Sequence, residues 1–310
     1  MTDNQIFNDT FFAMGTRCDI VFTDLENEFA EQMFQLVKKE VVYLEKILSR
    51  FIPTSAVAEI NNADKNKWLT VPEDLWNAIA LCFDFYQMSN GAFDITAGPI
   101  INLWKKKSGE SAKVSKKEII KALEKSGFHR VDLDFEKKRL RYTADNMELD
   151  FGAIGKGIAI DRIKPLLERS GVKNGIVSFG ESSILALGKH PNGGSWPLGI
   201  RNSFQPNEYV HVFSANNECV TTSGIVVNND DGQIKWRNHI ISPVYGYPVE
   251  ENKLVSVKSQ SASLGEFIST TWLILPEEDK NILAEQLKDI EILEAEYTEE
   301  KEFKTKLTVI

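Results

Sequence analysis

The sequence predicts an α+β fold, with helices flanking mixed or antiparallel sheets, because helical and strand-like segments are segregated along the chain. Apolar residues recur at helical spacing mainly near the two ends, over residues 26–49, 73–89 and 261–288. Between residues 175 and 257 the pattern changes to short runs separated by turn residues. There is no regular strand–helix alternation, and the 310 residues predict a single domain, 1–310, as one body or two intertwined subdomains.

The first third of the chain reads as one strand followed by three helices. A strand is predicted over residues 11–22, and an amphipathic helix over 26–49. A second helix, 73–89, begins after a proline. A third runs from the Ser-x-x-Glu capping box at Ser115 to Gly127.

The middle and the end of the chain supply the sheets and the last helices. Short strands are expected around residues 130–135, 139–143 and 147–151, before a helix over 158–170. Seven further strands are predicted at 175–180, 182–188, 196–202, 209–214, 218–224, 235–242 and 254–259. Helices 261–275 and 277–288 and a strand near 290–296 complete the pattern.

Composition narrows the classes of function. The net charge of −9 and the pI of about 5.2 argue against nonspecific nucleic-acid binding, and runs such as 105–107 are typical of solvated faces. Three isolated cysteines and no paired histidines argue against a disulfide framework or a transition-metal site. No signal peptide or transmembrane segment is visible. We therefore expect a cytoplasmic protein, or a periplasmic or membrane-anchored one if an export or lipoprotein signal was removed.

Residues 149–161, LDFGAIGKGIAID, resemble a phosphate-binding turn without matching either familiar one. A P-loop needs a hydroxyl residue after the lysine, where Gly157 stands. The dinucleotide fingerprint needs a third glycine where Ile160 stands. A helix start beside Lys156 can bind an anion, but the stretch alone favours a structural turn.

Glu266 and Thr270 are four residues apart on a predicted helix, so both oxygens project from one face. A carboxylate and a hydroxyl are hard oxygen ligands suited to Mg²⁺, with waters and ligand phosphates completing the shell. The simpler interpretation is a surface glutamate and a threonine bonding its own backbone, and the pair alone favours it.

Eight segments in order resemble the FAD:protein FMN transferase family (ApbE-type) over nearly the whole chain. They are MGT (14–16), SRFIPTSAVAEIN (49–61), GAFDITAGPIINLW (91–104), LDFGAIGKGIAID (149–161), GVKNGIVSFGES (171–182), TTSG (221–224), HIISPVYG (239–246) and GEFIST (265–270). The resemblance implies the family's own T-fold-like α+β fold, which is neither Rossmann nor P-loop. It also implies Mg²⁺-dependent transfer of FMN from FAD, the substrate, to a Ser or Thr hydroxyl of an acceptor flavoprotein, with release of AMP.

The resemblance implies roles for twelve residues. The FAD contacts would be Met14, Phe51, Asp94, Ile95, Thr96, Asp150, Lys156 and Ile241, with Lys156 at the phosphates. Mg²⁺ would be bound by the carbonyl of Ala153 and by Glu266 and Thr270. His239 would be the general base, a role that the near-neutral pKa of histidine suits.

Four positions depart from the family pattern and keep two alternatives open. The usual metal-binding aspartate is Glu266, the D-P-R-T-G segment is SPVYG (242–246), G-G-D is GES (180–182), and the acid after S-G is Ile225. One alternative is an FAD pyrophosphatase, which uses water as nucleophile and gives FMN and AMP. The other is a degenerate FAD-binding protein without turnover.

Overall fold

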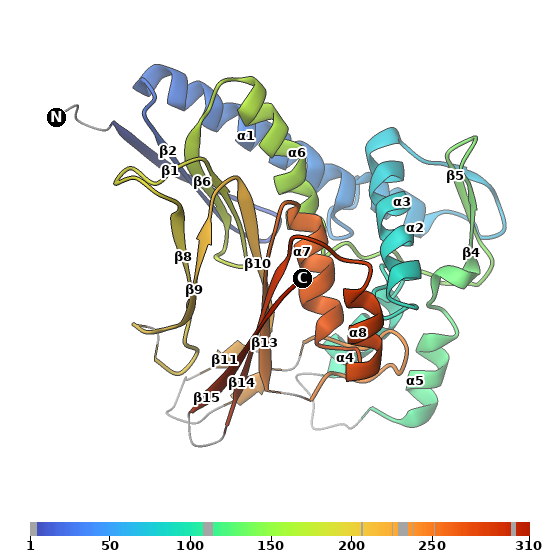
Figure 1. Ribbon diagram of the computed structural model, residues 1–310. Coiled ribbons are helices and arrows are strands. Elements are labelled where there is room, and N and C mark those ends of the chain that lie inside the picture. Colours follow the sequence, from blue (N-terminus) through green and yellow to red (C-terminus); the bar gives the residue numbers. More distant parts are fainter. Residues whose placement is uncertain are drawn as a thin grey trace.

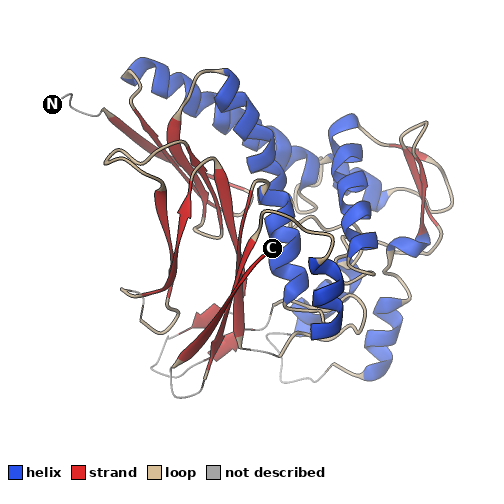
Figure 2. Ribbon diagram, viewed as in Figure 1, coloured by secondary structure: helices blue, strands red, loops and turns tan. Residues whose placement is uncertain are grey.

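The computed structural model describes residues 5–107, 114–205, 207–224, 226–228, 235–237, 239–250, 252–298 and 302–310. Ile225 lies outside these described residues. The predicted α+β class is confirmed: helices gather on one side of a large antiparallel sheet (Figures 1 and 2). No helix among the described residues is both long and apolar enough to cross a bilayer.

Eight antiparallel strands form the main sheet in the order β1-β2-β6-β7-β10-β13-β14-β15. Their bounds are β1 Ile6–Ala13, β2 Thr16–Thr23, β6 Asn174–Phe179, β7 Ser183–Leu187, β10 Glu218–Gly224, β13 Lys253–Ser259, β14 Glu291–Tyr297 and β15 Phe303–Val309. Smaller sheets pair β3 Leu69–Thr70 with β5 Arg139–Tyr142 and β4 Val131–Asp134, β8 Trp196–Arg201 with β9 Tyr209–Ala215, and β11 Val226–Asn228 with β12 Lys235–Arg237. Strand β10 lies near the centre of the main sheet and pairs with β7 up to Thr221, whereas its last residues, Thr222–Gly224, pair with β13 alone.

The helices are α1 Asn27–Leu48, α2 Ala56–Asn62, α3 Glu73–Met88, α4 Gly98–Lys107, α5 Lys116–Leu123, α6 Gly155–Arg169, α7 Ala262–Trp272 and α8 Glu277–Ala284, with a 3₁₀ turn at Phe128–Arg130. Helices α1 and α6 bury their apolar stripes against the first strands of the sheet. The hairpin β8–β9 packs its apolar residues with residues of β7, β10 and β13 in a separate cluster.

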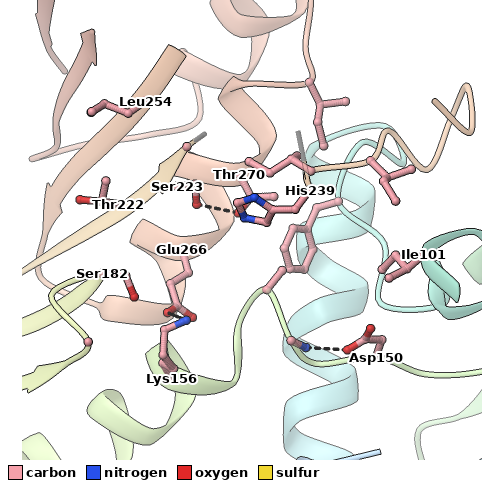
Figure 3. A pocket seen from close by; sticks show the side chains of 18 of the residues that line it. Ile101, Asp150, Lys156, Ser182, Thr222, Ser223, His239, Leu254, Glu266 and Thr270 are labelled. Atoms are coloured by element: carbon pink, nitrogen blue, oxygen red, sulfur yellow. Dashed lines mark hydrogen bonds and ion pairs between the residues drawn. The ribbon is translucent and has the colours of Figure 1, made fainter. Parts of the chain in front are cut away.

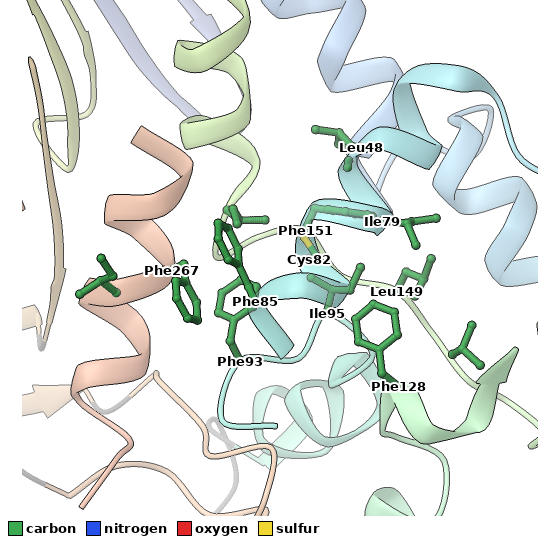
Figure 4. Packing of buried hydrophobic residues seen from close by; sticks show 14 of the residues in the cluster. Leu48, Ile79, Cys82, Phe85, Phe93, Ile95, Phe128, Leu149, Phe151 and Phe267 are labelled. Carbon is green, nitrogen blue, oxygen red and sulfur yellow. The ribbon is translucent and has the colours of Figure 1, made fainter. Parts of the chain in front are cut away.

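Helix α7 is buried on nearly all sides, which explains its apolar composition. Phe267 is 0 % exposed, and its ring stacks on Phe85 of α3 with centroids 4.3 Å apart (Figure 4). Phe93 meets the same ring edge-on at 5.5 Å. Because α7 is enclosed, its polar residues are shielded from water, and among the described residues Thr271 Oγ1 and Trp272 Nε1 have no hydrogen-bond partner.

The structure corrects the predicted strand 11–22, which is a hairpin of β1 and β2. Met14 and Gly15 form the two-residue turn, with φ of 52° and 72°. Two positive φ angles suit the tight turns of antiparallel hairpins, and glycine adopts them without strain. The Met-Gly pair is not among the usual signals of such a turn, so the sequence showed one long strand.

One further predicted strand fails for a similar local reason. Residues 147–151 form only a single bridge, because Leu149 N–H donates to the side chain of Asn61 (2.9 Å) and Asp150 N–H donates to the Ile95 carbonyl (2.7 Å). Helix α2, capped by Ser55, was not predicted. Helix α4 and strand β15 were also not predicted.

Candidate active site

A cavity of about 730 Å³ lies between the start of α6, the face of α7, the end of β10 and the hairpin β8–β9 (Figure 3). Its size is typical of small-molecule sites. Ten of the twelve residues with implied roles line it: Phe51, Asp94, Ile95, Asp150, Ala153, Lys156, His239, Ile241, Glu266 and Thr270. Segments that are far apart in the sequence therefore converge on one site.

The stretch 149–161 fixes α6 against α7. A Cβ at Gly157 would lie 2.7 Å from the Cα and N of Ser263, so only glycine allows the two helices to approach this closely. The Gly157 N–H donates to Oε2 of Glu266 (2.8 Å). The contact places the side chain of Lys156 beside the carboxylate of α7 (Figure 3).

Asp161, four residues further along α6, caps the start of α7. Its carboxylate accepts hydrogen bonds from Ser261 Oγ (2.7 Å), Ala262 N (2.7 Å) and Ser263 N (3.0 Å). These bonds satisfy the free N–H groups of the first turn and place a negative charge at the positive end of the helix dipole. The same sequence stretch thus sets both the distance and the register of α7.

Glu266 is buried, with 4 % of its surface exposed. Its Oε1 accepts a hydrogen bond from Ser183 Oγ (2.5 Å) and lies 3.6 Å from Lys156 Nζ. Burial raises the pKa of the Glu266 carboxyl, and the Lys156 ammonium, the Ser183 hydroxyl and the Gly157 amide oppose that rise. A surface glutamate, the simpler interpretation of this residue, is therefore wrong.

Thr270 lies one turn further along α7 and lines the same cavity. Its Oγ1 is 3.0 Å from Ser223 Oγ at the end of β10, and Ser223 is also 2.8 Å from Ser269 Oγ. The Thr-Thr-Ser-Gly segment therefore contributes Thr222, Ser223 and Gly224 to the wall of the cavity. The i, i+4 spacing does place both α7 oxygens on one face, as expected.

The oxygen donors present fit a small hard cation such as Mg²⁺. The Gly157 N–H donates to Glu266 rather than to the Ala153 carbonyl, so that carbonyl receives no hydrogen bond from the described residues. A carboxylate, a hydroxyl and a free carbonyl then line one cavity. Among the described residues no group of three or more His, Cys, Asp and Glu side chains could hold a metal. Mg²⁺ commonly binds only one or two carboxylates and completes its shell with water and phosphate oxygens, so a site with one carboxylate is compatible with this ion.

Asp150 is held in place by a buried arginine that the sequence did not single out. Arg50 Nε lies 3.1 Å from Asp150 Oδ2, and Arg50 Nη1 lies 2.7 Å from Glu148 Oε1. The Arg50 guanidinium also lies 4.9 Å from the ring centre of Phe51, which is 73 % exposed at the cavity. Arg50 therefore fixes both an acidic group and an aromatic surface of the site.

Asp94 lines the cavity, and Thr96 lies two residues further along the chain. Burial raises the pKa of Asp94 to about 6, against the opposing effect of hydrogen bonds from Thr96 and from Phe128 N (3.2 Å). Thr96 is fully buried and does not line the cavity; its Oγ1 accepts from Gly127 N (2.5 Å). Thr96 thus supports the loop behind Asp94 rather than facing the cavity.

His239 lies at the open end of the cavity and is exposed. In Figure 3 its imidazole projects over the region of Ser223 and Thr270. The following loop, 242–248, carries Tyr245, which is 64 % exposed, and Trp104 Nε1 donates to the Gly246 carbonyl of this loop (2.8 Å). The His239 side chain is therefore accessible to a molecule that approaches from outside.

Met14 does not line the cavity. It lies in the β1–β2 turn and packs against the buried apolar residues that α1 and α6 share with the first strands of the sheet. Its N–H donates to Glu45 Oε1 (2.6 Å). Conversely, Lys105 lines the cavity, with its ammonium 5.4 Å from the Phe51 ring, although its run of lysines indicated only a solvated face. Hairpin β8–β9 also contributes lining residues that no local sequence signal marked: Gly199, Ile200, Arg201, Ser203 and Tyr209.

Comparison with known proteins gives consistent matches over most of the chain. FAD:protein FMN transferases from Buchnera aphidicola and Klebsiella pneumoniae are 25 % and 26 % identical, covering 87 % and 88 % of this chain and 80 % and 83 % of their own. The flavin transferase ApbE from Vibrio cholerae has a TM-score of 0.84 at 19 % identity, covering 98 % of this chain and 97 % of its own. The apo flavinyl transferase ApbE of Pseudomonas stutzeri has a TM-score of 0.83 at 23 % identity, with coverage of 98 % and 95 %.

The two structural matches have the same mixed fold with antiparallel sheets. The model of the ApbE family matches residues 14–293, which include all twelve residues with implied roles. The chain therefore belongs to the ApbE family.

Proposed function

We propose that this protein is an FAD:protein FMN transferase, which moves FMN from FAD to a Ser or Thr hydroxyl of an acceptor flavoprotein and releases AMP. The observation that carries the proposal is the convergence of Lys156, Glu266, Thr270 and His239 on one cavity. The names of the curated relatives supply the substrate and the group transferred.

The cavity offers surfaces for both parts of FAD. Phe51, Ile95 and Ile241 are apolar lining residues that can cover a planar flavin ring. Lys156, on the first turn of α6, adds its ammonium to the positive end of that helix. The pyrophosphate would therefore lie at the start of α6, with the flavin toward Phe51.

Glu266, Thr270 and the Ala153 carbonyl would hold Mg²⁺, which supplies Lewis-acid stabilisation of charge on the phosphate oxygens. His239 would accept the proton of the acceptor hydroxyl, whose oxygen then forms a bond to the phosphorus of the FMN moiety. The bond from that phosphorus to the bridging oxygen breaks, and AMP leaves with the bridging oxygen. Lys156 would bind the pyrophosphate oxygens as negative charge develops on the leaving group.

Two variants test the proposal on a candidate acceptor flavoprotein with FAD and Mg²⁺. The protein should produce an acceptor band that remains flavin-fluorescent after denaturation. His239→Ala should lower the rate about 10²- to 10⁴-fold, and Glu266→Ala at least about 100-fold. A Glu266→Ala protein as active as the original would remove the carboxylate from the mechanism. Release of AMP and free FMN without acceptor would instead favour the pyrophosphatase.

A further inference from the structure

The Glu266 carboxylate has two kinds of partner. Ser183 Oγ and Gly157 N–H are buried, and neither residue lines the cavity. The third partner, Lys156 Nζ at 3.6 Å, lies on the cavity side, where its side chain remains 24 % exposed. Two partners are thus fixed behind the carboxylate, and one flexible cation lies in front of it (Figure 3).

Lys156 compensates a charge that the fold otherwise leaves inside the protein. A buried carboxylate is costly without an opposite charge, and Lys156 is the cation within 4 Å of Glu266 among the described residues. A divalent cation on the same carboxylate would repel the ammonium strongly in this enclosed site. Lysine has a long, flexible stem, so its ammonium can move away while its backbone stays fixed at the start of α6.

We infer that Lys156 is an internal counter-ion, and that it and the divalent metal bind the Glu266 carboxylate in competition. Arrival of the metal displaces the ammonium into the cavity, where it can bind the pyrophosphate oxygens of FAD. Metal and FAD therefore favour each other's binding through one side chain, and this coupling is reciprocal. The inference rests on the proposed function for the identity of the metal and of the phosphate ligand.

Competition and ligation predict opposite changes in metal affinity when the side chain is removed. Removal of a group that helps to hold a metal weakens metal binding, whereas removal of a competing cation strengthens it. In the FAD-free protein, Lys156→Met should therefore bind Mn²⁺ more tightly, by about tenfold or more given the short ion-pair distance. Mn²⁺ is a suitable probe because it uses the same oxygen ligands as Mg²⁺.

The experiment is a Mn²⁺ titration of FAD-free protein at pH 8, followed by electron paramagnetic resonance of the free ion. Lys156→Arg keeps the charge and should bind Mn²⁺ as the original protein does. Lys105→Met removes a charge from the same cavity, beside Phe51 rather than Glu266, and should change the affinity less than about twofold. Lys156→Gln provides a second neutral side chain, and thermal melting confirms that each variant is folded.

Tighter Mn²⁺ binding by both neutral Lys156 variants, but not by Lys105→Met, supports the inference. Unchanged or weaker binding by Lys156→Met and Lys156→Gln overturns it. Mn²⁺ binding by Glu266→Gln that is as tight as that of the original protein also overturns the inference. None of these measurements requires FMN transfer. The result of this test can therefore be distinguished from the result of the transferase assay.

Discussion

The two ends of the cavity differ in how firmly they are held. At the closed end, Lys156, Glu266 and Thr270 project from two helices in glycine-mediated contact, and each polar group has a partner within the protein. At the open end, Phe51 and His239 are exposed, and so are Val244, Tyr245 and Tyr247 of the loop 242–248. The closed end is thus preorganised for a small ligand, whereas the open end offers a surface to a second molecule.

The closed end should depend most on the packing of α7. Phe267→Ala removes a fully buried ring that stacks on Phe85 at 4.3 Å, and should lower the free energy of unfolding by about 3–5 kcal/mol. Urea unfolding followed by circular dichroism measures the loss. A loss below about 1 kcal/mol would show that α7 is not held by this stack.

Asp94 should make stability depend on pH. Its pKa is raised from 3.8 to about 6 in the folded protein, so the folded state binds the proton more tightly than the unfolded chain. This group therefore favours folding fully below about pH 4, and up to about 3 kcal/mol of that contribution is lost as the pH rises through 6. Asp94→Asn should flatten the change in unfolding free energy between pH 4 and 7. An unchanged slope would contradict the assignment.

The open end should tolerate substitution without loss of stability. Tyr245 is 64 % exposed, so Tyr245→Ala should change the free energy of unfolding by less than about 0.5 kcal/mol. On the proposed function, any effect should appear in the concentration of acceptor needed for half-maximal rate and not in the affinity for FAD. Titration with acceptor and with FAD separately checks this. A matching loss of FAD affinity would place the loop in the flavin site.

The elements that sequence predicts well are those with strong local patterns. Helix α1 shows a regular apolar stripe, and its observed bounds, Asn27–Leu48, lie within a residue or two of the predicted range, 26–49. The prediction missed the β1–β2 turn, because Met14 and Gly15 adopt positive φ angles that their residue types do not signal. It also predicted a strand around Leu149, where the backbone instead donates a hydrogen bond to the side chain of Asn61. Contacts of this kind leave little trace in the local sequence pattern.

Most of the predicted residues line the cavity, but their arrangement could not be predicted. Family resemblance pointed to Glu266 and Lys156, while the pair Glu266–Thr270 alone favoured an exposed helix face. The burial of Glu266 comes from a contact with Gly157, 109 residues away in the sequence, and from Ser183 on a third element. Arg50 and the β8–β9 hairpin were missed because nothing near them in the sequence indicates which cavity they approach.

The most direct test of the account counts AMP and acceptor-bound FMN in one reaction of FAD, Mg²⁺ and the acceptor flavoprotein. Chromatography quantifies AMP, and mass spectrometry of the intact acceptor quantifies covalently attached FMN. The account predicts one AMP for each FMN attached, and almost no AMP when the acceptor hydroxyl is replaced by Ala. AMP formed at the same rate without attachment, or FAD left intact with Mg²⁺ and acceptor present, would contradict it.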